Sequence, residues 1–268
     1  MTSPSKRFLI FIPIIFSFLL FASYGGVLIY SRFKGTIEEL YGSTARFITV
    51  SQSFPILTML LIQAGFGAVS ILILFLYFRK THSSEVFFFM FGLFGFVIQT
   101  SRFLIAPVSM VTLSAYSLTP FTRLVYFGRL FTILCFFASG LFATGFTSQR
   151  RNFSLSLILL ISFVITAIIP VDFTMVKLPL VFATAGTTEF TLTYYALAVF
   201  TVLNFLLAAS KHSETNYRYV AAAISLVIAG VEVSFFYPYG LGAVTGLLLI
   251  AGGTYLFAER THEIYLWL

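Results

Sequence analysis

The chain has 268 residues, of which 59% are hydrophobic and 9% charged, and its formal net charge is +7. Soluble domains carry about 25% charged residues, so this composition excludes an ordinary soluble fold and requires that the chain lie in a lipid bilayer. The basic residues come in scattered pairs, which argues against a nucleic-acid-binding patch and is typical of cytoplasmic loops of membrane proteins.

Apolar runs of about 20 residues follow one another along the chain, and each can cross the ~30 Å hydrocarbon core as a helix. None shows the alternation expected of a membrane β-barrel strand. The sequence therefore predicts an all-α, polytopic bundle of transmembrane helices that forms one integral membrane domain over residues 1–268. We expect eight spans, at residues 8–30, 53–78, 86–107, 119–147, 153–171, 190–209, 219–237 and 239–258.

The start of the first span allows a second interpretation. Lys6 and Arg7 precede the apolar run and would suit a secretory signal peptide. The run is longer than 20 residues, however, whereas the hydrophobic region of a signal peptide has about 7–15. A retained first span is the favoured interpretation, and cleavage would leave seven spans.

Lysines and arginines gather at every second loop, which sets the expected orientation. The basic set is Lys6, Arg7, Arg79, Lys80, Arg150, Arg151, Lys211, Arg218 and Arg260. The other loops mix basic with acidic residues. The sequence therefore predicts that both termini are cytoplasmic, that loops 31–52 and 172–189 lie outside, and that the protein is a multi-pass protein of the inner or plasma membrane of the cell.

Short loop motifs suggest a parallel internal repeat that relates residues 8–147 to residues 153–258. The similar segments are 82–85 with 212–214, and 35–38 with 186–189. The first match also aligns Arg102 with Glu232. Such a repeat would place a site between its halves. Chance similarity is the slightly favoured interpretation, because the two matches need different offsets.

Four charged residues fall within the predicted spans: Arg102, Arg123, Arg129 and the single acid, Glu232. Ionisable groups in a bilayer usually face a partner or a watery cavity. A helical rise of 1.5 Å per residue places three of them roughly 6–14 Å below the outer edge of the hydrocarbon core. At these depths either Arg102 or Arg129 could pair with Glu232, whereas Arg123, only ~5 Å deep, could extend to the headgroups.

Helical periodicity places these charges on stripes of small and polar residues, which in lipid normally face other helices. The stripes are Gly92, Gly95, Gln99 and Arg102 in the third span, Thr122, Tyr126, Arg129 and Thr132 in the fourth, and Ser225, Ala229 and Glu232 in the seventh. The sequence therefore predicts one polar cluster of Gln99, Arg102, Arg129 and Glu232 beneath the external surface.

The cluster has three interpretations. It is an ion pair that fastens helices together, a pocket for an anionic or carboxylate-bearing ligand, or a proton or cation pathway. The third is the least favoured, because one acid beside arginines stays ionised and lacks the further titratable groups of a relay. A separate stripe of Gly242, Gly246 and Gly253 predicts close packing of the last helix.

The sequence contains none of the following catalytic or cofactor-binding motifs within the spans: histidine, aspartate, zinc-protease and phosphate-loop patterns. The three histidines fall in predicted loops or in the C-terminal tail, the sole aspartate falls in an external loop, and neither a zinc-protease motif nor a phosphate-binding loop occurs. We therefore expect no metal, no cofactor and no enzymatic activity.

Together these patterns favour a small-molecule transporter or ligand-binding membrane protein with an outward-facing polar cluster. The alternative is a non-catalytic membrane subunit, or a sensor or receptor that acts through a partner. The expected partners are the lipid bilayer, an anionic small molecule and, for the alternative, a membrane or cytoplasmic protein; nucleic acid is not among them.

Overall fold

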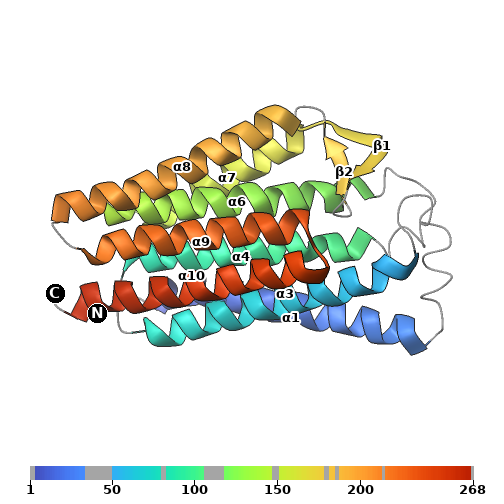
Figure 1. Cartoon of the computed structure of the whole chain (residues 1–268), viewed down its shortest axis with the longest axis horizontal. Coiled ribbons are helices and arrows are strands. Elements are labelled where there is room, and N and C mark those ends of the chain that lie inside the picture. The colour runs from blue at the N-terminus through green and yellow to red at the C-terminus, as the bar shows by residue number, and fades with distance from the viewer. Residues whose placement is uncertain are drawn as a thin grey trace.

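The computed structural model describes residues 4–33, 50–79, 83–105, 118–146, 151–177, 181–184, 187–212 and 215–266. Most of the predicted loop 31–52, and parts of each of the matched segments of the predicted repeat, lie outside these ranges. In the described part of the chain, long helices run back and forth along one axis, and both ends of the chain lie at the same end of the bundle (Figure 1).

Eight long helices occupy the places of the eight predicted spans. They are α1 (Pro4–Phe33), α3 (Val50–Tyr77), α4 (Ser84–Gln99), α6 (Thr119–Ala143), α7 (Arg151–Ile168), α8 (Thr187–His212), α9 (Asn216–Phe236) and α10 (Gly240–Leu266). Seven are long and apolar enough to cross a membrane, and α1 carries a shorter apolar stretch, Phe11–Val27. The helical fold class is thus confirmed, and the chain is a multi-pass membrane protein.

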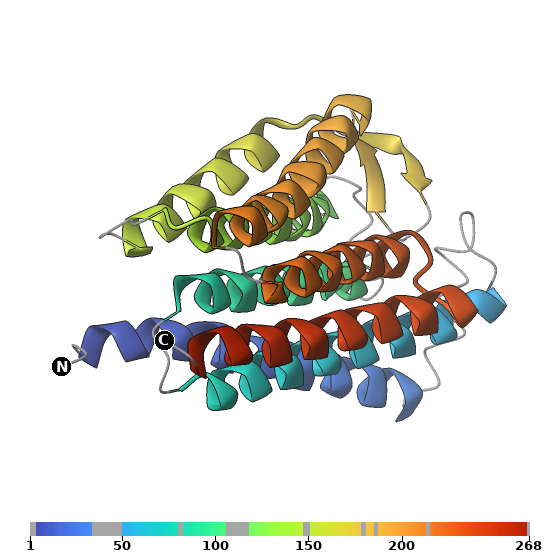
Figure 2. The ribbon, with the colours of Figure 1, turned by 60° about the vertical axis from the view of Figure 1, so that its left-hand side comes forward.

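The helices form three layers (Figures 1 and 2). Helices α1, α3 and α10 make one outer layer, α4 and α9 lie in the middle, and α6, α7 and α8 make the other outer layer. Nearly every residue of α4 is buried. In contrast, α7 buries only Leu155, Ser162 and Thr166, so most of its apolar surface is left for lipid.

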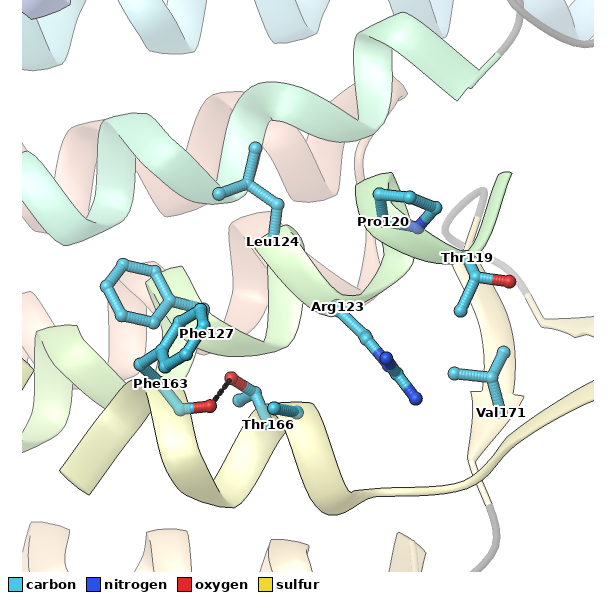
Figure 3. Close-up of a pocket in the computed structure, with 9 residues that line it drawn as sticks. Thr119, Pro120, Arg123, Leu124, Phe127, Phe163, Thr166 and Val171 are labelled. Atoms are coloured by element: carbon cyan, nitrogen blue, oxygen red, sulfur yellow. Dashed lines mark hydrogen bonds between the residues drawn. The ribbon is translucent and has the colours of Figure 1, made fainter. Parts of the chain in front are cut away.

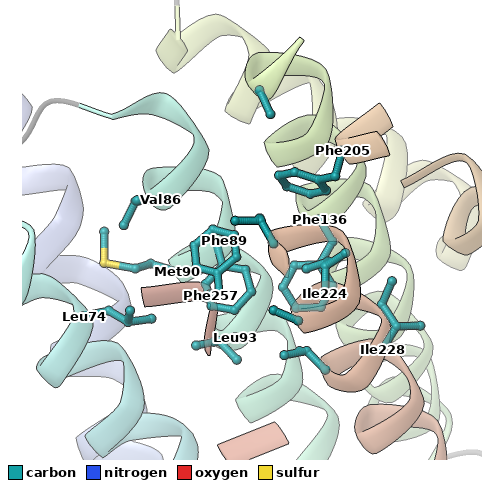
Figure 4. Close-up of a cluster of buried hydrophobic side chains, with 14 of the residues drawn as sticks. Leu74, Val86, Phe89, Met90, Leu93, Phe136, Phe205, Ile224, Ile228 and Phe257 are labelled. Carbon is teal, nitrogen blue, oxygen red and sulfur yellow. The ribbon is translucent and has the colours of Figure 1, made fainter. Parts of the chain in front are cut away.

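Aromatic rings fill the space between the layers near the start of α4 and the end of α10 (Figure 4). Phe89 of α4 stacks on Phe257 of α10 with ring centroids 3.8 Å apart, and its centroid is 5.4 Å from that of Phe136 of α6. Phe205 of α8 meets Phe257 edge-on at 6.4 Å. One central helix therefore contacts both outer layers through large apolar side chains, which fixes the positions of α4 and α9 between them.

The third span departs from a single α-helix. Helix α4 ends at Gln99, and Thr100–Leu104 form a 3-10 helix, η1. A 3-10 helix has 3.0 residues per turn instead of 3.6, so residues after Gln99 turn to other directions than an α-helix would give them. This change bears directly on Arg102.

A β-hairpin joins α7 to α8. Strands β1 (Val171–Lys177) and β2 (Val181–Thr184) pair antiparallel, with Val171 opposite Thr184 and Lys177 opposite Val181. The sequence predicted only a loop over 172–189, although apolar and polar residues alternate from Val171 to Met175 as in a strand. The hairpin lies at the end of the bundle opposite the termini (Figure 1).

The last two helices form a helical hairpin. The turn between them runs from Tyr237 to Tyr239, and Gly240, which opens α10, has a φ of +61°. This left-handed conformation suits glycine because a side chain would be strained there. The tight turn brings α9 and α10 side by side along their length (Figure 2).

Candidate functional site

An ion pair joins α6 to α9 toward the end of the bundle that carries the β-hairpin. Nη2 of Arg129 lies 2.7 Å from Oε2 of Glu232, and the two side chains are 3% and 12% exposed. Separating such partners would leave a charge without compensation in a bilayer. The pair is therefore a strong link between two helices that are about 100 residues apart in sequence.

Aromatic side chains surround the Arg129 guanidinium. Its Cζ lies 4.6 Å from the ring centroid of Tyr194, 4.3 Å from that of Phe235 and 5.1 Å from that of Phe236. These distances are within the ~6 Å range of cation–π attraction. Tyr195 donates its hydroxyl to the paired carboxylate at 3.2 Å, so α8 completes the site beside α6 and α9.

The sequence did not single out Tyr194 or Tyr195. They lie four and five residues into the predicted span 190–209, which corresponds to a depth of ~6–8 Å. Glu232 has an estimated depth of ~10 Å in the same half of the membrane. The similar depths of these residues in the membrane could therefore have indicated, from the sequence, that the two tyrosines lie at the level of Glu232.

Arg102 does not pair with Glu232. Its Nη1 donates to the carbonyl oxygen of Phe235 at 2.8 Å, and its Nη2 donates to that of Ser234 at 2.9 Å. These carbonyls belong to the last turn of α9, where the helix leaves its own acceptors unpaired. The guanidinium, 2% exposed, therefore caps the negative end of the α9 dipole.

The 3-10 winding of η1 explains this difference from the expected stripe. A continuous α-helix would have placed Gln99 and Arg102 on one face. Instead, Gln99 donates from Nε2 to Oγ1 of Thr132 in α6 at 3.1 Å, whereas Arg102 reaches the end of α9. Gln99 and Arg102 therefore contact different helices, α6 and α9 respectively.

The predicted stripes of the third and fourth spans face each other, whereas the stripe of the seventh span does not face inward as expected. A Cβ added at Gly95 would lie 2.9 Å from the backbone nitrogen of Thr132, and one added at Gly128 would lie 2.8 Å from that of Gln99. On α9, Ala229 is exposed and Ser225 is partly exposed. Glu232 therefore lies at the border of the buried face of α9, and its acid group extends from that border to Arg129.

Three polar atoms at the site are buried and have no hydrogen-bond partner among the described residues. They are Nε of Arg102, Nε of Arg129 and Oε1 of Glu232. Arg102 and Arg129 flank the same ring, since their Cζ atoms lie 5.3 and 4.3 Å from the centroid of Phe235. Buried polar groups in proteins are nearly always hydrogen-bonded, so these are the atoms through which the site could bind a further polar group.

Arg123 takes no part in this cluster. It is exposed and lines a cavity between α6 and α7. Its place one and a half turns before Arg129 on α6 turns it to another side of the helix. Of the charges predicted within the spans, Arg102, Arg129 and Glu232 come together and Arg123 remains apart.

A second buried acid, Glu85, was expected in a loop and is part of the bundle. It is 5% exposed in the first turn of α4, and its Oε1 accepts the hydroxyls of Tyr217 and Tyr265, each at 3.1 Å. Ser83 caps the same helix by accepting the amide of Val86 at 3.3 Å. The sequence signal was this serine followed by glutamate, which is typical of a helix start.

The three glycines of the predicted stripe in α10 lie against α9 or the turn before it. A Cβ at Gly246 would lie 2.9 Å from the backbone nitrogen of Ser234, and a Cβ at Gly253 would lie 2.7 Å from the carbonyl oxygen of Ala223. A Cβ at Gly242 would meet that of Tyr237 at 2.5 Å. The glycines of the predicted stripe thus lie where α10 approaches α9 and the turn before it too closely for a larger side chain.

The arrangement of charges at this site could attract an anion. Two guanidinium groups and one carboxylate leave a formal local charge of +1, and the end of α9 supplies roughly −0.5. Comparison of the chain with models of protein families, with curated proteins and with solved structures finds no match.

Proposed function

We propose that this membrane protein binds a small anionic molecule, as a transporter or another ligand-binding membrane protein, at the cluster of Arg102, Arg129 and Glu232. The main observation behind the proposal is that the charge of Arg102 is buried without a full counter-charge. It is 2% exposed, and no carboxylate of the described residues pairs with it. A guanidinium buried at membrane depth normally has a counter-charge or an aqueous surrounding, and the partial charge of the helix end compensates only about half of it.

The unpaired atoms suit a carboxylate or phosphate ligand. Arg102 and Arg129 each retain a buried Nε–H donor that no described residue accepts. Oxygen anions form their strongest hydrogen bonds with guanidinium groups. The remaining acceptor, Oε1 of Glu232, would favour a ligand that also carries a hydroxyl or an amino group. The proposal includes no catalytic step, metal or cofactor.

The alternative function is that of a non-catalytic subunit or a receptor that acts through a partner protein. The short Arg129–Glu232 distance of 2.7 Å and the aromatic rings around Arg129 support it. In that case the cluster is dry and only fastens α6, α8 and α9 together. The two functions differ in one measurable property, which is whether water reaches the cluster.

Thiol accessibility measures this property. With Cys135→Ser as the background, Glu232→Cys should react with a membrane-impermeant thiosulfonate reagent added to intact cells. Leu226→Cys is the matched control, because Leu226 is 37% exposed on the same helix but lies six residues deeper in the predicted span. We expect modification of the first variant and none of the second, since thiosulfonates react with the ionised thiol.

Absence of reaction at Glu232→Cys, in protein that elutes as a folded species, would contradict the binding proposal and favour the dry link. Tyr195→Cys keeps the ion pair intact and repeats the test if Glu232→Cys fails to fold. Tyr195 is 45% exposed and contacts the carboxylate, so reagent that reaches the site also reaches this position.

A further inference from the structure

The cavity between α6 and α7 is separate from the ion-pair cluster. Its volume is about 550 Å³, which lies in the usual range of about 300–1,000 Å³ for ligand sites. Figure 3 shows the side chains that line it. They are Thr119, Pro120, Arg123, Leu124, Phe127, Phe163, Thr166, Ala167 and Val171.

We propose that this cavity binds an amphiphile of the membrane, with an anionic phosphate or carboxylate head beside Arg123 and a hydrocarbon tail along α6 and α7. This site does not depend on the function proposed above. It rests on three observations: a guanidinium that no carboxylate of the described residues pairs with, an apolar wall, and the order of polar and apolar residues along the helices.

The polar end of the cavity lies where α6 begins. The guanidinium of Arg123 extends into it (Figure 3), and no carboxylate of the described residues pairs with Arg123. Asp172 follows Val171 in the chain but does not line the cavity. Thr119 is 7% exposed, and within the described part of the chain its hydroxyl has no hydrogen-bond partner. An oxygen anion here would be bound by a guanidinium close to a helix N-terminus.

The apolar end lies deeper along the same helices. Phe127 is one turn beyond Arg123 on α6, and Phe163 is one turn before Ala167 on α7. Figure 3 shows the two phenylalanines together at the end of the cavity away from Thr119 and Val171. Phe163 is 64% exposed, so the cavity is accessible from the surroundings of the bundle rather than only from its end.

This order matches a lipid rather than a small soluble anion. A headgroup lies at the membrane boundary and its chains extend toward the bilayer centre, as do the polar and apolar ends of the cavity. An arginine that merely extends to the headgroups would need no hollow with aromatic walls. A soluble anion would gain nothing from Leu124, Phe127 and Phe163.

The test is retention of defined lipids by the purified full chain, measured by native mass spectrometry from mixed nanodiscs. We expect dioleoyl phosphatidylglycerol and oleate to be retained in preference to dioleoyl phosphatidylcholine. Arg123→Gln should lower retention of both anionic probes roughly tenfold, which is the effect of losing one charge-assisted hydrogen bond. Arg218→Gln, another exposed arginine in the described chain, should have no effect.

A second variant tests the tail. Phe163→Ala removes the exposed ring at the apolar end, so it should lower retention of oleate without removing the guanidinium. Equal retention of phosphatidylglycerol and phosphatidylcholine would overturn the proposal, as would equal retention by the Arg123→Gln and Arg218→Gln variants. Binding of inorganic phosphate as tight as that of the lipids would show an anion site without a tail and would equally overturn it. Both arginines are exposed, and unchanged thermal unfolding would show that the variants fold.

Discussion

Arg102 and Arg129 are both buried cations, but they play different parts at the site. Arg129 has a carboxylate partner, and Arg102 has two carbonyl oxygens at the end of α9. The estimated depths of the residues could identify the group of charges. They could not assign the partners, because the 3-10 turn after Gln99 redirects Arg102.

Substitution of Arg129 should strongly destabilise the protein. Arg129→Gln leaves Glu232 without its partner, and loss of one member of a buried pair typically lowers the free energy of unfolding by about 3–5 kcal/mol. The 12% exposure of Glu232 places the expected loss at the lower end. Thermal unfolding in detergent measures it. Arg260→Gln is the control, because the Arg260–Glu263 pair is 30% and 38% exposed and should contribute less than about 1 kcal/mol.

Exchange of charges should distinguish the two arginines. Arg129→Glu combined with Glu232→Arg restores an ion pair, so it should recover part of the expression lost in each single variant. Arg102→Glu combined with Glu232→Arg should recover none, because Arg102 contacts carbonyl oxygens that repel a carboxylate. The yield of monodisperse protein measures recovery. Equal recovery by both exchanges would show that the assignment of partners is wrong.

At the scale of elements, Glu85 connects the start of α4 to α9 and α10 through the hydroxyls of Tyr217 and Tyr265. Glu85→Leu removes the shared acceptor, and we expect it to lower the free energy of unfolding by about 2 kcal/mol. Glu85→Gln keeps an acceptor oxygen of nearly the same shape and should lower it much less. Thermal unfolding of the two variants checks this. Similar effects would mean that packing, rather than the hydrogen bonds, stabilises this junction.

Two glycines of α10 provide a matched test of its packing against α9. Gly246→Ala would place a methyl group 2.9 Å from the backbone nitrogen of Ser234, whereas Gly252→Ala meets nothing within 4 Å. Alanine favours a helix by up to about 1 kcal/mol over glycine. Thermal unfolding should therefore show destabilisation by Gly246→Ala and none by Gly252→Ala. Destabilisation of equal size would indicate that close contact is not the reason for glycine at Gly246.

The eight helices could be predicted because a bilayer allows few other structures for uniformly apolar runs. The β-hairpin was missed because strands β1 and β2 fall in a segment that was assigned by charge alone. The turn from α4 to η1 was also missed, since no proline or glycine between Gly95 and Leu104 marks it. These elements are set by local and tertiary contacts that hydropathy does not describe.

At the scale of the whole molecule, the site is assembled from η1, α6, α8 and α9. The sequence identified Arg102, Arg129 and Glu232 because charges in apolar spans are rare. It could not reveal Tyr194 and Tyr195, because nothing in a single sequence shows which helices are neighbours. Only the layered arrangement, with α9 in the middle and α8 beside it (Figure 2), explains how one site draws on segments so far apart.

The central claim is that the buried charge of Arg102 makes the cluster attractive to anions, and the sign of the local field tests it most directly. In a Cys135→Ser, Tyr195→Cys background, the modification rates of an anionic and a cationic thiosulfonate are each divided by their rates with a small free thiol. We predict that the anionic reagent reacts faster, and that Arg102→Gln brings the ratio of the two rates close to one. A faster reaction of the cationic reagent, or a ratio unaffected by Arg102→Gln, would contradict the claim.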